Sequence, residues 1–277
     1  MVRKLFRIEF IKTVAYGPVK ILIPLHLLFF LLGFFTIPNI PINFPFLSVQ
    51  PLYQFPHVWN FITWVGGSYN LTLVLLVIML TCLEFNNKTF KHQVIFGLSR
   101  QDLFLQKVIL AFMFALYATV LIFFTVLVSG LIYSYKITLG IMFERSWILL
   151  NTFLQSFTWL MTGIMFALIF KNMILSVLIF GFYRVILEPV VRNLVPDAAN
   201  GFFPTKFVSK LTPEPDILNM VKENIQSSRS VSPDELAAFE SMIPEGVPIW
   251  QNLILTLIFL GMVSFFIHFI FNKRRLT

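Results

Sequence analysis

Two long apolar runs, Val58–Leu83 and Val108–Tyr135, constrain the fold most strongly, because neither contains an Asp, Glu, Lys or Arg. Each run exceeds the roughly 20 residues that an α-helix needs to cross a bilayer. Across the chain only 12% of the residues are charged, whereas soluble domains carry about 25%. A soluble globular protein is therefore excluded. The charged segment between the two runs, residues 84–107, is expected to lie in water at one face of a membrane.

The remaining sequence predicts an all-α polytopic membrane protein with one transmembrane domain over residues 1–277. Residues 1–17 mix basic and apolar side chains, which favours a helix in the membrane interface, with a plain basic tail as the alternative. Residues 193–247 are the only long polar segment, and they are expected to fold onto the outer ends of the spans, with short helices over 216–226 and 233–242. The predicted spans are 21–37, 58–83, 108–135, 147–170, 173–192 and 250–271.

The distribution of charge predicts the orientation of these six spans. With both termini in the cytoplasm, 13 of the 21 Lys and Arg residues lie on the cytoplasmic side, opposed there by only Glu9, Glu84 and Asp102. This is the asymmetry that the positive-inside rule describes. The net charge of +8 therefore reflects membrane topology, and no nucleic-acid partner is expected.

The charged segment between the first two long runs has an internal pattern. Residues 88–96 contain no Gly or Pro and are predicted to form a short helix, with Phe90 and Val94 on one side. Gly97 is expected to end this helix, and Ser99 is expected to cap the next one. The pattern therefore predicts a small helix lying beneath two spanning helices.

This segment resembles the first cytoplasmic loop of the permeases of ABC-2 type transporters, in which a short coupling helix docks on the ATPase. The resemblance is carried by Glu84, Lys88-Thr89-Phe90, Gly97-Leu98-Ser99-Arg100 and Lys107. It implies two ABC ATPase subunits as partners, a second permease chain, identical or homologous, and export across the bacterial cytoplasmic (inner) membrane. It also implies that ATP and Mg bind to the ATPase, and this chain indeed has no G-x-x-x-x-G-K-[ST] phosphate loop.

The same resemblance suggests which side chains meet the ATPase. Phe90 and Val94 are expected to enter a cleft, and nearby cations are expected to pair with an acidic rim. The alternative is that these cations bind anionic lipid headgroups. The predicted docking residues are Glu84, Lys88, Thr89, Phe90, Lys91, Val94 and Arg100.

Polar side chains within the spans suggest a second functional region. On the fourth span they recur at spacings of 4, 3 and 4, which places them on one helix face. Two interpretations stay open, namely hydrogen bonds between helices and a stripe that lines a substrate path suited to an amphipathic molecule. The candidate path residues are Ser68, Asn70, Asn151, Gln155, Thr158 and Thr162.

The fifth span carries the charges Arg184, Glu188 and Arg192 at i, i+4 and i+8. Arg184 comes only 11 residues after the start of that run, which is about half of the 30 Å apolar layer. We expect Arg184 and Glu188 to form a buried charge pair, because intramembrane charges normally face protein or water. Either the helix ends early below a vestibule, with Pro189 breaking it, or it carries an ion ladder.

No catalytic pattern is present. The chain has no H-E-x-x-H motif and no nucleophile elbow, and its single Cys82 and four scattered His residues do not have metal-ligand spacing. We therefore expect no enzyme activity, no cofactor and no metal in this chain. The alternative to a permease is an ATP-independent transporter or a scaffold subunit of a cell-envelope complex.

Overall fold

The structure is a computed structural model that describes residues 2–36, 38, 50–135, 137–215 and 248–273. The described residues form helices joined by short turns, and six helical segments are long and apolar enough to cross a membrane. The prediction of an all-helical membrane protein is thus confirmed. These segments are Gly17–Thr36, His57–Asn86, Arg100–Tyr133, Leu139–Phe170, Met173–Asn193 and Ile249–Lys273.

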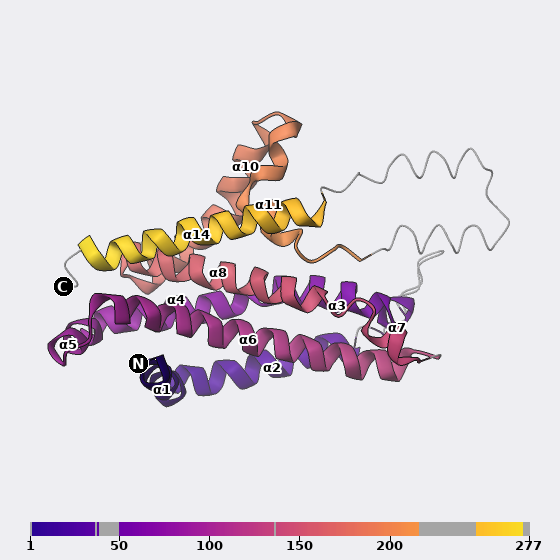
Figure 1. The fold of residues 1–277 in the computed structure, drawn as a ribbon, viewed down its shortest axis with the longest axis horizontal. Helices are drawn as coiled ribbons and strands as arrows, with labels where there is room; N and C mark the ends of the chain where they lie inside the picture. Colours follow the sequence, from indigo (N-terminus) through magenta and orange to yellow (C-terminus); the bar gives the residue numbers. More distant parts are fainter. Residues whose placement is uncertain (1, 37, 39–49, 136, 216–247, 274–277) are drawn as a thin grey trace.

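The long helices lie side by side in a bundle (Figure 1). The N-terminal helix, the short helix α5 (Thr89–Ile95) and the end of the last helix share one end of the bundle. Helices α3 (His57–Tyr69) and α7 (Leu139–Phe143) occupy the other end. The main bundle helices are α2 (Gly17–Thr36), α4 (Leu71–Asn86), α6 (Arg100–Tyr133), α8 (Ile148–Phe170) and α14 (Ile249–Lys273).

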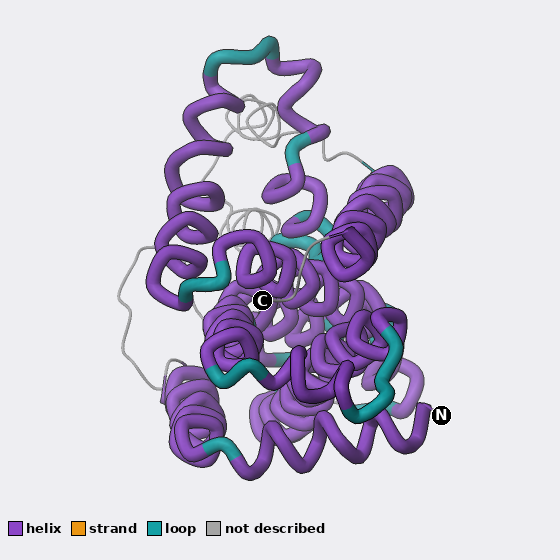
Figure 2. The backbone as a smooth tube through the Cα atoms, turned by 90° about the vertical axis from the view of Figure 1, so that its left-hand side faces the viewer, coloured by secondary structure: helices purple, strands orange, loops and turns teal. Residues whose placement is uncertain are grey.

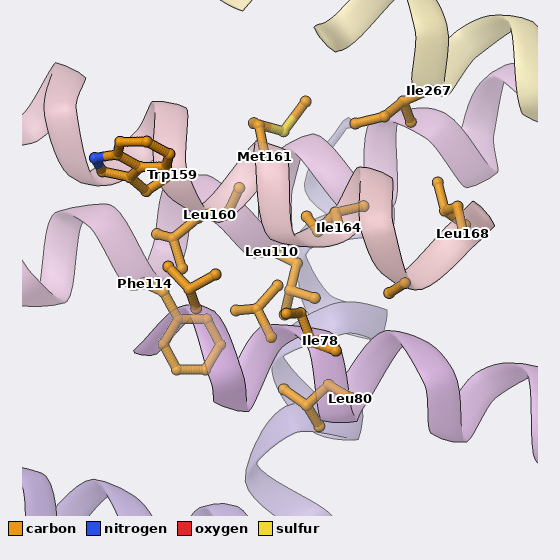
Figure 3. Packing of buried hydrophobic residues seen from close by; sticks show 14 of the residues in the cluster. Ile78, Leu80, Leu110, Phe114, Trp159, Leu160, Met161, Ile164, Leu168 and Ile267 are labelled. Carbon is orange, nitrogen blue, oxygen red and sulfur yellow. The ribbon is translucent and has the colours of Figure 1, made fainter. Parts of the chain in front are cut away.

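Helices α4, α6 and α8 form the centre of the core (Figure 3). Ile78, Leu110 and Ile164 contribute fully or almost fully buried side chains from these three helices. Gly163 allows the close approach of α8 to α4, because a Cβ there would lie 2.5 Å from Cγ1 of Val74. Small residues commonly serve this purpose where membrane helices pack.

Helix α1 (Val2–Ala15) lies across the end of the bundle, roughly perpendicular to the long helices (Figure 2). Leu5 and Glu9 on one face are buried, whereas Phe6 and Phe10 on another face are about half exposed. The predicted N-terminal helix is therefore present. That it lies in the membrane interface stays a prediction, with which its exposed phenylalanines agree.

The fifth candidate span comprises α9 (Met173–Phe182), a π-helical turn (Tyr183–Leu187) and α10 (Glu188–Asn193). Of the two alternatives for this segment, the early end is wrong, because the helix continues past Pro189 to Asn193. A proline ring clashes with the carbonyl four residues before it, and the π turn immediately before α10 widens the helix where that clash would arise.

After α10 the chain turns back toward the bundle through two short helices. The 3₁₀ helix η4 (Asp197–Phe202) leads into α11 (Pro204–Ser209), which packs between the first halves of α8 and α14. Phe207 contacts Phe259 of α14, with ring centroids 5.9 Å apart. This part of the polar segment therefore enters the bundle and does not only cover its outer ends. The helices predicted over 216–226 and 233–242 lie outside the described residues.

Candidate functional site

A closed ring of four charges lies at the end of the bundle that carries α5. Lys107 Nζ lies 2.6 Å from Glu84 Oε2 and 3.4 Å from Glu9 Oε1. Lys12 Nζ lies 2.5 Å from Glu84 Oε1 and 3.0 Å from Glu9 Oε1. Each ammonium group thus contacts both carboxylates, and the four formal charges sum to zero. We call Glu9, Lys12, Glu84 and Lys107 the charge ring.

The charge ring joins three elements that are distant in the sequence. Glu9 and Lys12 come from α1, Glu84 from the end of α4, and Lys107 from the second turn of α6. Lys107 is 0% exposed, and a lysine at such a site requires a paired charge. The ring therefore fixes α1 against the ends of two spanning helices. It also corrects one prediction, because Glu84 pairs within its own chain and is not presented to a partner.

Helix α5 is held against the bundle by Phe90. This side chain is 1% exposed and contacts Phe85 and Phe271, with ring centroids 4.8 and 5.6 Å away. Lys107 of the charge ring lies 5.3 Å from the Phe90 ring centroid. The prediction that Phe90 enters a cleft of a partner is therefore wrong, because Phe90 already fills a site between α4, α6 and α14.

The boundaries of α5 follow the sequence signals. Gly97, with φ of 89°, ends the helix in the left-handed region. Ser99 and Asp102 form a complete capping box at the start of α6. Arg100 donates hydrogen bonds to the carbonyl oxygens of Phe271 and Asn272. Its expected pairing with an acidic partner is thus replaced by a contact with the end of α14.

The apolar tip of α5, formed by Val94, Ile95 and Phe96, is exposed. Ile95 is 67% exposed and Phe96 is 85% exposed. Of the other predicted docking residues, Lys88 and Lys91 are exposed and Thr89 is half-buried. Sequence reasoning identified Val94 but missed Ile95 and Phe96, although their position just before Gly97 places them at the end of the helix.

The polar face of α8 makes hydrogen bonds inside the chain. Asn151 Nδ2 donates to the carbonyl of Leu211 at 3.1 Å, and Gln155 Nε2 donates to the carbonyl of Ser209 at 3.3 Å. Thr158 and Thr162 are buried and donate to carbonyls of their own helix. Asn151 and Gln155 thus hold the end of α11 and the residues after it in place, whereas Thr158 and Thr162 bond only within α8.

The two candidate path residues of the second span differ in their surroundings. Asn70 is buried at the junction of α3 and α4 and donates to Ser156 Oγ at 3.0 Å. Ser68 is exposed. That these residues and the α8 stripe line a translocation path stays a prediction.

The charges of the fifth helix do not form the expected pair. Glu188 is buried, and its Oε1 accepts hydrogen bonds from the backbone N–H of Thr205, at 2.6 Å, and from the Thr205 hydroxyl. The Arg184 guanidinium carbon instead lies 4.0 Å from the centroid of the Trp159 ring. Within the part of the chain that the structure describes, every direct ion pair belongs to the charge ring. Glu188 therefore anchors α11, and no ion ladder with Arg192 forms.

An apolar groove of about 410 Å³ runs between α2, α4 and α9. His26 lies on its lining and is buried, with Nδ1 3.3 Å from the Tyr117 hydroxyl. Its Nε2 is buried without a hydrogen-bond partner among the described residues. A buried nitrogen of this kind normally has a partner. The groove thus combines apolar walls with one free polar atom, a combination typical of ligand sites.

The described residues contain no cluster of His, Cys, Asp and Glu that could hold a metal ion. Comparison with known protein families gives no match, and no curated protein matches the chain.

Proposed function

We propose that this chain is the transmembrane permease subunit of an ABC-2 type ABC transporter. A second permease chain, identical or homologous, would complete the path, and two separate ABC ATPase subunits would bind ATP and Mg and drive export. The protein would lie in the bacterial cytoplasmic membrane with both termini and α5 in the cytoplasm. The charge asymmetry of the sequence supports this orientation.

The attachment of α5 is the observation that carries the proposal. Phe90 is buried against α4 and α14, and Lys107 of the charge ring lies beside it. The tip of the same helix exposes Ile95 and Phe96 at the polar end of the bundle. A partner that moved this tip would act on the ends of several spanning helices, because Phe90 packs α5 against α4 and α14. Exposed apolar side chains of this kind mark interaction sites.

This geometry moves the proposed docking contact from Phe90 to the tip of α5. The groove beside His26 would be a further part of the path, and its apolar walls suit an amphipathic substrate. The second permease chain is tested by crosslinking in the membrane. A complex with one permease chain for each pair of ATPase subunits would contradict this part of the proposal.

The decisive experiment compares two exposed aromatic residues at opposite ends of α6. Phe96→Asp changes the tip of α5, whereas Tyr135→Asp changes a side chain that is 90% exposed at the far end of α6. The 34 residues of α6 separate the two ends by about 50 Å. Each variant is purified from its native membrane, and the amount of co-purifying protein with a phosphate-loop sequence is measured together with ATP hydrolysis.

We expect the wild type and Tyr135→Asp to retain the ATPase and Phe96→Asp to lose it, with equal membrane insertion of all three. If Phe96→Asp retains the ATPase, α5 is not the docking element. If the wild type brings down no phosphate-loop protein, the permease proposal fails and the ATP-independent transporter or scaffold becomes the better explanation.

A further inference from the structure

A hollow of about 460 Å³ lies beside the start of α5, at the end of α4. Its lining includes Lys88 and Lys91 from the α5 region and Lys171 from the turn between α8 and α9. Phe85 and Phe90 also line it. Lys171 Nζ lies 5.3 Å from the centroid of the Phe85 ring. Three cations from two separate segments therefore converge on one concave site with aromatic side chains on its lining.

The charges of Lys88 and Lys91 are not balanced by Glu84, the acid on the same lining. Glu84 also lines the hollow, but both of its oxygens are already engaged by Lys12 and Lys107 in the neutral charge ring. Lys88 and Lys91 have no ion pair with any residue that the structure describes. The site thus carries an excess of positive charge, and the complementary ligand is an anion.

The position of the hollow along the membrane normal follows from Glu84, which the hollow shares with the charge ring. Glu84 belongs both to the lining and to the ring that holds α1, so the hollow lies at the level of α1 along the bundle. Helix α1 crosses the bundle end with Phe6 and Phe10 exposed, as expected for a helix at the boundary of headgroups and acyl chains. At that depth a membrane presents the phosphate groups of its lipids.

The backbone at two of the three lysines gives independent support. Lys88 has φ of 52° and Lys171 has φ of 55°, so both are in the left-handed region. A turn that served folding alone would favour Gly or Asn there. Both turns instead carry a lysine, and both lysines line the same hollow. This points to a requirement for their charge.

We propose that this hollow binds the phosphate headgroup of an anionic phospholipid. Lysine ammonium groups act as mobile point charges toward phosphate oxygens and need no fixed bidentate geometry. Lys88, Lys91 and Lys171 would contact the phosphate, and the acyl chains would extend along the bundle beside α4 and α9. The inference requires only a membrane protein with this structure, so it does not depend on the proposed transport function.

The test uses nanodiscs of phosphatidylcholine, with and without phosphatidylglycerol, and native mass spectrometry of the lipids that remain bound. The variant combines Lys88→Gln, Lys91→Gln and Lys171→Gln. The control combines Arg3→Gln, Lys4→Gln and Arg7→Gln on α1, which removes the same charge at the same membrane face. We expect the wild type and the control to retain phosphatidylglycerol. The lysine variant should bind it about a hundredfold more weakly, and Lys91→Arg alone should retain it.

Several results would overturn the proposal. They are equal retention of phosphatidylcholine and phosphatidylglycerol, equal loss in the α1 control, or full competition by inorganic phosphate at the same concentration. The Phe96→Asp variant should keep its phosphatidylglycerol, and the lysine variant should keep any ATPase. If the lysine variant loses the ATPase but keeps the lipid, these lysines belong to a protein interface and the lipid assignment is wrong. These paired readouts separate a failure here from a failure of the proposed function.

Discussion

Replacing Lys107 with methionine tests whether the charge ring holds together the end of the bundle that carries α1 and α5. Lys107→Met keeps the length of the side chain and removes its ammonium group. Glu9 and Glu84 would then share only Lys12, and the largely buried site would carry a net negative charge. Removing one partner of a buried ion pair typically costs about 3–5 kcal/mol. Because Lys107 is 0% exposed and contacts both carboxylates, we expect a loss of unfolding free energy in this range.

The same reasoning predicts a partial recovery. The combination of Lys107→Met and Glu84→Gln removes one cation and one anion, and it leaves the 3.0 Å pair between Lys12 and Glu9. Since replacing a buried ion pair with neutral groups is often close to neutral in stability, the double variant should lose about 1–2 kcal/mol. The two changes would then be strongly non-additive, as expected for residues of one network.

The measurement is unfolding in mixed micelles as the fraction of dodecyl sulfate rises, followed by tryptophan fluorescence. Lys91→Met provides the control, because it makes the same chemical change at an exposed lysine of the same bundle end. We expect it to stay within about 0.5 kcal/mol of the wild type. A cost below about 1 kcal/mol for Lys107→Met would refute the charge ring. Strict additivity in the double variant would refute it equally.

Two further predictions concern packing and use the same unfolding measurement. Phe90→Ala should cost about 3–5 kcal/mol, because it empties a filled site between three helices, whereas Phe96→Ala should change stability by no more than about 0.5 kcal/mol; similar costs at both positions would contradict the burial of Phe90. Gly163→Ala should gain about 1 kcal/mol of helix propensity but lose about 1–3 kcal/mol to overpacking against α4. In the control Gly261→Ala the new methyl group meets nothing within 4 Å, so this variant should be more stable than the wild type. A stabilising effect at both glycines would show that α8 and α4 are not in close contact.

The sequence predicts the spans well because the bilayer sets their length and composition independently of tertiary packing. All six predicted spans overlap a candidate membrane helix. The Gly97 stop and the Ser99 cap are equally local, and both are found where they were expected. Local chemistry does not fix how far a spanning helix continues into water. Helix α6 accordingly begins at Arg100, eight residues before its apolar run.

The charge ring could not be derived from local patterns, because its members are separated by up to 98 residues. One signal was nevertheless present. On the helical wheel of residues 1–17, Glu9 and Lys12 fall away from the other basic residues, which makes the helix look poorly amphipathic. The structure explains this misfit, because Glu9 and Lys12 point into the ring while Phe6 and Phe10 point outward. A charged pair on the wrong face of an interfacial helix is therefore a signal for a buried partner.

The long sequence separation of contacting residues also explains why the proposed docking contact lies at the tip of α5 and not at Phe90. Helical spacing places Phe90 and Val94 on one side of a short helix, but it does not tell whether that side meets a partner or the helix's own chain. Phe90 contacts Phe271, which lies 181 residues later in the sequence. Only the folded bundle therefore reveals that Phe90 packs against its own chain. The consequence is mechanical. An α5 with its largest side chain exposed could rotate without moving the spans, whereas an α5 anchored through Phe90 and flanked by the charge ring must move with them.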